Sequence, residues 1–113
     1  MRTYKVIPRR SNLERMVSFK DKAETVKFDY GAWAEENGTV TAVTWTLKSG
    51  SAVISGTNLS ANVATAVITT SEVGGSVIKV KATTGSNIDI AHLDVFTKDP
   101  DRIVNDYGFV YEG

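Results

Sequence analysis

The sequence predicts an all-β sandwich, because three observations agree. Apolar and polar residues alternate along several short segments, which is the period of a strand with one buried side. Turn-forming groups such as "ENG", "KSG", "EVGG" and "TTGSN" separate these segments at the spacing typical of sandwiches and small barrels. No long helical pattern interrupts the 113 residues, so we expect one domain of two packed sheets.

The clearest alternating segments define which residues should face the core. These residues are, in chain order, Val26, Phe28 and Tyr30, then Val43, Trp45 and Leu47, then Ile78, Val80 and Ala82. Segment 63–69 is partly apolar on both sides, so its inward side stays open. The apolar residues shift from even to odd positions within "NIDIAHLDVFT", which predicts a β-bulge near Ala91.

The two tryptophans lie in unlike surroundings and are expected to have different roles. Trp45 belongs to a middle strand, where its ring should span the gap of about 10 Å between two packed sheets. Trp33 lies in "GAWAEENG", which breaks the strand period and predicts a single helical turn or a wide loop. We expect Trp33 to close the open end of the core. The alternative is an exposed anchor for a partner.

The first 22 residues are expected to form an arm in front of a sandwich that spans residues 23–99. Tyr4 belongs to a short alternating piece at the start of this arm. The sequence "SNLERMVSF" is interpreted as a short turn of helix capped at Ser11 or Asn12.

Residues 100–113 are expected to form a second arm behind the sandwich. This segment is strongly apolar for the end of a chain, and Tyr107, Phe109 and Tyr111 would share one side of a strand. Such a tail should lie either on its own domain or on a neighbouring chain, and both possibilities stay open.

Charge and composition exclude several classes of partner. Lys and Arg number 13 and so do Asp and Glu, and the resulting zero net charge argues against nucleic acid as the main partner. Basic residues, Arg9 and Arg10 among them, gather near the start, where a solvated arm or docking onto an acidic neighbour is expected. The absence of cysteine excludes disulfides and thiolate sites. We expect no membrane span and no signal peptide.

Side chains that could carry catalysis are sparse. His92 and Asp94 share one side of a predicted strand, with Asp89 nearby. A metal site needs three or four convergent ligands, and a catalytic triad also needs a placed nucleophile. Glu35 and Glu36 are adjacent and would not share a face in regular structure. We therefore expect no enzyme, no cofactor and no metal.

Two stretches resemble a family of small tail proteins of tailed bacteriophages, the fiber–tail adaptors. They are "FDYGAWAEENGTVTAVTWTLKSGSAVIS" and "NVATAVITTSEVGGSVIKVKATTGSNIDIAHLDVFTKDP". The resemblance covers about residues 24–100 and consists mainly of Trp45, the Gly74-Gly75 turn and the "TTGSN" loop. It implies an immunoglobulin-like antiparallel β-sandwich of about seven strands and a structural place in the virion, at the tail or neck.

These observations predict a non-enzymatic virion protein, made in the host cytoplasm, that docks fibers or other tail proteins through its two arms. We expect several copies in a symmetric ring, and free ends that order on assembly. Candidate contact residues are Tyr4, Arg9, Arg10, Trp33, Tyr107, Phe109 and Tyr111. The alternatives are a capsid decoration protein and a carbohydrate-binding module in which Trp33 and the tail tyrosines stack on sugars.

Overall fold

The computed structural model describes residues 2–8, 12–99, 102–104 and 110–112, the last two ranges for their backbone only. Its elements are β1 (Arg2–Lys5), β2 (Asn12–Phe19), β3 (Glu24–Asp29), α1 (Gly31–Asn37), β4 (Ala42–Ser49), β5 (Val53–Ser60), β6 (Val63–Thr69), β7 (Gly74–Thr83), β8 (Ile88–Lys98), β9 (Arg102–Val104) and β10 (Val110–Glu112).

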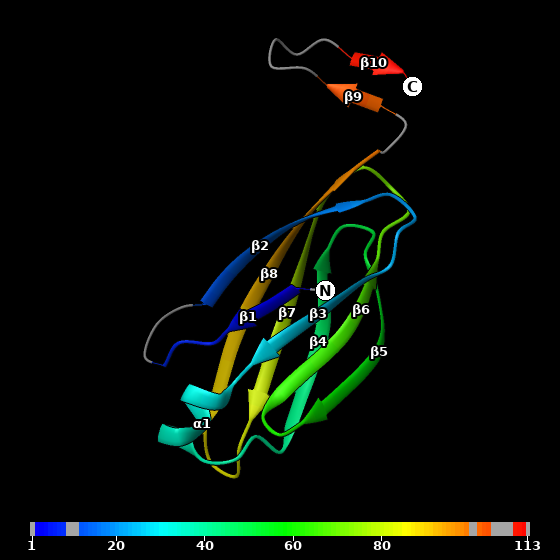
Figure 1. Ribbon diagram of the computed structural model, residues 1–113. Helices are drawn as coiled ribbons and strands as arrows, with labels where there is room; N and C mark the ends of the chain where they lie inside the picture. Colours follow the sequence, from blue (N-terminus) through cyan, green and yellow to red (C-terminus); the bar gives the residue numbers. More distant parts are fainter. Residues whose placement is uncertain (1, 9–11, 100–101, 105–109, 113) are drawn as a thin grey trace.

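Two four-stranded sheets pack against each other (Figure 1), with strand orders β1-β3-β6-β5 and β2-β8-β7-β4. Most neighbours pair antiparallel, whereas β1 runs parallel to β3 and β2 runs parallel to β8. The predicted all-β, immunoglobulin-like sandwich is confirmed, with eight strands in the two sheets of the described chain where about seven were expected.

The first 22 residues are largely part of the sandwich, which corrects the prediction of a free N-terminal arm. β1 and β2 form adjoining edges of the two sheets, and the expected helix at "SNLERMVSF" is the strand β2. Met16 and Ser18 of β2 face inward and are buried, while Leu13 faces out. The Ser18 hydroxyl lies 3.4 Å from the hydroxyls of Thr70 and Thr97, which ties β2 into the space between the sheets.

The core contains most of the residues that the alternating pattern places inside. Leu47 is an exception, because it lies on the edge strand β4 and has 38% of its surface exposed. Phe28 is fully buried and contacts the ring of Tyr4 at 5.5 Å and the ring of Trp45 at 5.6 Å between centroids. The other large side chains that are fully buried are Val6, Val26, Tyr30, Ile68, Ile78, Val80, Leu93 and Val95. Segment 63–69, whose inward side the sequence left open, buries Ala64, Ala66 and Ile68.

Trp45 lies at the margin of the core, which corrects the prediction that it occupies the centre. Its side chain is half-buried and packs edge-on against Phe28. The reason is strand order, because β4 is the edge strand of its sheet and its inward side chains reach only the margin of the interface. Phe28, on the internal strand β3, takes the central position instead.

Trp33 closes one end of the core, as the sequence predicted. It lies in the short helix α1 with 5% of its surface exposed, and its ring meets that of Tyr30 edge-to-face at 5.9 Å. The Asp29 Oδ1 atom accepts a hydrogen bond from the Gly31 N–H at 2.8 Å, which turns the chain from β3 into the helix.

The predicted bulge near Ala91 is absent. The pairing of β7 with β8 runs without a register shift from Gly74 opposite Thr97 to Thr83 opposite Ile88. Ala91, Leu93, Val95 and Thr97 face the core, whereas Ile88 and Ile90 face outward. The sequence pattern changed phase because the apolar residues move from the outer side of β8 to its inner side.

The Asn12 side chain joins the segment that follows β1 to the start of β2. Its Oδ1 atom accepts a hydrogen bond from the Ile7 N–H at 3.0 Å, and its Nδ2 donates to the Ile7 carbonyl at 3.2 Å. Since Asn12 is buried, we expect Asn12→Ala to leave two backbone groups poorly satisfied and to lower the free energy of unfolding by about 2 kcal/mol. Urea unfolding tests this, and a loss indistinguishable from zero would refute the role.

Candidate docking surface

Six large apolar side chains are exposed on the outer side of β2 and β8. We call this surface the β2–β8 face. Its members are Leu13, Val17 and Phe19 of β2 and Ile88, Ile90 and Phe96 of β8, each with between 40% and 57% of its surface exposed. The outer face of a sandwich sheet is normally polar, so an apolar group of this kind indicates a surface that binds something.

Strand pairing brings members of the face together. Val17 lies opposite Phe96 in the β2–β8 register, and Arg15 lies opposite Asp94 between the apolar positions. The outer side of the neighbouring strands β7 and β4 is polar, with Lys79 and Thr46 paired across them. The apolar character is therefore confined to one half of the sheet, the half that ends at the β2 edge.

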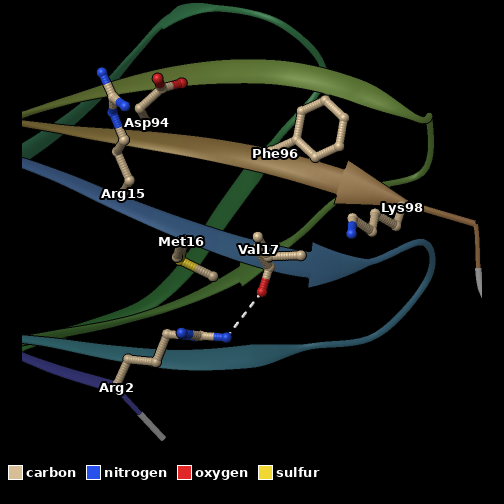
Figure 2. A pocket seen from close by; sticks show the side chains of 7 residues that line it. All are labelled: Arg2, Arg15, Met16, Val17, Asp94, Phe96 and Lys98. Atoms are coloured by element: carbon tan, nitrogen blue, oxygen red, sulfur yellow. Dashed lines mark hydrogen bonds between the residues drawn. The ribbon is translucent and has the colours of Figure 1, made fainter. Parts of the chain in front are cut away.

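A groove of about 650 Å³ continues from this face around the edge of β2 (Figure 2). The residues that line it are Arg2, Arg15, Met16, Val17, Asp94, Phe96 and Lys98. Three cations and one carboxylate surround the apolar side chains, and the Glu24 carboxylate lies 3.2 Å from Arg2 at the border. The groove therefore combines an apolar floor with a small surplus of positive charge.

Side chains of β1 cover the outer edge of β2, which is the edge strand of its sheet. Arg2 Nη2 donates to the Val17 carbonyl at 2.9 Å, and the Tyr4 hydroxyl donates to the Arg15 carbonyl at 3.2 Å. Burial raises the pKa of Tyr4, so its hydroxyl keeps its proton near neutral pH. These bonds cover acceptors that an added strand would need, so a partner is expected to bind through side-chain contacts with the face and the groove, and not by strand pairing.

The opposite edges of the two sheets are irregular. The pairing of β4 with β7 shifts between Leu47 and Ser49, and that of β5 with β6 shifts between Ser55 and Asn58. Bulges of this kind twist an edge strand and disfavour pairing with another chain. Contact through side chains of the β2–β8 face is thus better supported than strand addition at these edges.

Of the residues predicted as partner contacts, only Tyr4 and Trp33 have described side chains, and both are at least half-buried. Tyr4 is half-buried between Phe28 and the β2 edge, and Trp33 is buried, which leaves little of its ring for a partner. Arg9, Arg10, Tyr107 and Phe109 lie outside the described residues, and Tyr111 is described only as backbone of β10.

Sequence reasoning missed Phe19 and Phe96, the two aromatic members of the face. The available signal was their position, since each alternates with buried neighbours in a strand and therefore points outward.

The candidate catalytic side chains do not all lie on one side of β8. His92 and Asp94 share the outer side of β8, as predicted, while Asp89 lies on the inner side. No group of three or more His, Cys, Asp or Glu side chains in the described part could hold a metal ion. Within the same part, no helix is long and apolar enough to cross a membrane.

Asp89 lies near the buried Tyr30, at the end of the core closed by α1. Burial raises the pKa of Tyr30, and the charge of Asp89 raises it further. Burial also raises the pKa of Asp89 above its ordinary value of 3.8. Neither the Tyr30 hydroxyl nor Asp89 Oδ2 has a hydrogen-bond partner among the described atoms.

This burial predicts a pH dependence of stability. The folded protein binds the Asp89 proton more tightly than the unfolded chain, so ionisation of Asp89 lowers stability as the pH rises through 3.8 and above. We expect Asp89→Asn to raise the free energy of unfolding at pH 7, and this gain to vanish at a pH well below 3.8. Unfolding in urea across this range tests it. A gain that persists or grows in acid would contradict the argument.

Comparison with known proteins supports the fold. No protein-family model matches the chain, and no curated protein matches it. A chimeric titin Z1Z2 protein carrying a KLER peptide from decorin is similar in structure, with a TM-score of 0.53, 17% identity, and coverage of 79% of this chain and 90% of that one. The cysteine protease inhibitor EhICP2 from Entamoeba histolytica has a TM-score of 0.52 and 8% identity over 86% of this chain and 96% of its own.

A third similar structure belongs to a much longer protein. The endo-fucoidan hydrolase MfFcnA4 of glycoside hydrolase family 107 gives a TM-score of 0.51 and 14% identity over 79% of this chain, but only 13% of the hydrolase is covered. At these identities the three likenesses describe the sandwich architecture alone. None of the three is described as a virion protein.

Proposed function

We propose that this chain is a non-enzymatic structural protein that binds neighbouring proteins in an assembly through its β2–β8 face. The observation that carries the proposal is the exposed apolar half of one sheet, whose other half is polar. A monomer in water would gain nothing from exposing Phe19, Phe96 and their neighbours, whereas a partner that covers them gains the free energy of apolar burial.

The resemblance to fiber–tail adaptors supports a bacteriophage virion as the setting, at the tail or neck where fibers attach. A rigid sandwich with one apolar face suits a permanent position among neighbouring subunits, because obligate interfaces are more apolar than transient ones. The zero net charge supports the same setting, since close packing of copies then costs little electrostatic repulsion. Capsid decoration would use the same face at a different place in the particle.

The carbohydrate-binding alternative depends mainly on an exposed Trp33, and this side chain is buried. A sugar-stacking platform needs an open aromatic face, and Trp33 is buried against Tyr30.

Antibody labelling of virions from the phage that encodes the chain tests the proposal. Label at the tail or neck supports the adaptor, label over the whole head supports decoration, and an unlabelled particle contradicts a virion protein. Phe96→Asp should reduce incorporation into the particle, while Val53→Asp, an exposed residue of the other sheet, should not. Incorporation of Phe96→Asp at the wild-type level would contradict a role for the face.

A further inference from the structure

We propose that the β2–β8 face binds the C-terminal tail, residues 100–113, of a second copy of this chain. The inference rests on the proposed docking function, because it names the occupant of the same face.

The chemistry of the groove selects a segment that is both aromatic and acidic. Its apolar wall includes Val17 and Phe96 (Figure 2). Its charged rim has three cations and one carboxylate, that of Asp94, so a small surplus of positive charge remains. The volume of about 650 Å³ lies within the range of about 300–1,000 Å³ in which proteins hold ligands, so several side chains of a peptide can enter. Aromatic anchors surrounded by a polar rim are the usual design of a binding interface.

The chain carries a segment of that composition at its own end. Residues 105–112 read "NDYGFVYE" and contain three aromatic side chains, two carboxylates and no Lys or Arg. The first 22 residues, which supply β1, β2 and two of the three cations of the groove, contain seven Lys or Arg and two Asp or Glu. The opposite charges of the two ends favour contact between them.

The two described strands of the tail, β9 and β10, join neither sheet of the sandwich. β8 ends at Lys98, β9 begins at Arg102, and β9 pairs with β10 and with no strand of either sheet. Figure 1 shows this pair beyond the end of β8, where the sandwich stops. The β2–β8 face of the same chain is exposed, so the tail of a neighbouring molecule can occupy it.

A contact of this kind is heterologous, because a tail on one copy meets a face on the next. Repetition of such a contact closes a ring or extends a filament, depending on the rotation between copies. The expected symmetric ring is therefore one product of this interface, and side chains of the face carry the contact because Arg2 and Tyr4 cover the β2 edge.

Sedimentation velocity of the full chain over a wide range of concentration tests the inference. We expect the wild type to self-associate reversibly. Phe96→Asp, and a tail variant with Tyr107, Phe109 and Tyr111 all changed to Ser, should each weaken association by about 30-fold or more. The control Val53→Asp, on the outer side of the other sheet, should associate like the wild type.

Mixing the two weakened variants separates tail-to-face contact from other arrangements. The Phe96→Asp chain keeps its tail and the tail variant keeps its face, so the mixture should form a one-to-one dimer that does not grow further. Undiminished association of the tail variant alone would overturn the inference in favour of a face-to-face dimer. Because the tail variant keeps Phe96 and the whole of β1 to β8, this result does not depend on whether Phe96→Asp folds.

A wild-type chain that stays monomeric throughout would also overturn the inference. Loss of Phe96→Asp from virions would then still support the proposed function, with a different protein as partner of the face. The two proposals therefore fail separately.

Discussion

Phe28→Ala is expected to cost about 3–5 kcal/mol of the free energy of unfolding. Phe28 has no exposed surface, lies on an internal strand, and contacts the rings of Tyr4 and Trp45. Its removal leaves a cavity between the sheets that the paired strands β1, β3 and β6 cannot close. The total free energy of unfolding of a domain of this size is about 5–15 kcal/mol. The variant should therefore unfold at a much lower urea concentration than the wild type.

Phe96→Ala is the matched control, since it makes the same chemical change on the outer face. Phe96 has 51% of its surface exposed, and we expect its replacement to change the free energy of unfolding of the monomer by about 1 kcal/mol or less. Equal losses for the two variants would show that the core is centred elsewhere.

Gly50→Ala is the second substitution with a large expected effect. Gly50 lies between β4 and β5 with φ at +91°, a region that side chains rarely adopt. A Cβ atom at this position would overlap Ser76 Oγ and would lie 2.5 Å from the Gly75 carbonyl oxygen and 2.6 Å from Ser76 Cα. Backbone of the internal strand β7 cannot move away cheaply, so we expect a loss of about 3 kcal/mol or more.

Gly56→Ala separates backbone strain from steric overlap. Gly56 also has a positive φ, +56°, but an added Cβ would meet only Val67 Cγ2, at an ordinary 3.4 Å. The cost should then be that of the left-handed conformation alone, about 1–2 kcal/mol. Urea unfolding of both variants gives the comparison, and a Gly50→Ala loss no larger than that of Gly56→Ala would rule out the close approach to β7.

The strands of the middle of the chain could be predicted because each carries its own signal. The alternation of Val26, Phe28 and Tyr30, and that of Ile78, Val80 and Ala82, follows from burial of one side and needs no knowledge of partners. Strand order is different, because it depends on contacts between distant segments. Trp45 fits the pattern of a core residue, and only the edge position of β4 explains why it is half-buried.

The strand β2 could not be predicted for a related reason. Leu13 and Met16 are spaced as on a helix, which favoured the helical interpretation. The strand forms because it pairs in parallel with β8, about eighty residues further along the chain. A local sequence pattern does not show which distant segment a strand will pair with.

The β2–β8 face could not be predicted from the sequence either. Alternation shows which residues share a side of a strand, but it does not show which side faces the core. The predicted bulge near Ala91 would place Ile88 and Ile90 on the same side of the strand as Leu93 and Val95. The structure places Ile88 and Ile90 on the outer side, where they join Phe96 and the β2 residues in the face.

Hydroxyl-radical footprinting tests the central proposal, that the β2–β8 face is covered in an assembly and that this assembly is a bacteriophage virion. Oxidation of Phe19 and Phe96 would be compared between the free chain and the same chain in purified virions, with the half-buried Trp45 at the opposite edge as internal reference. We expect both phenylalanines to be oxidised readily in the free chain and to be protected in the virion. Equal oxidation of Phe19 and Phe96 in the two states would contradict the account.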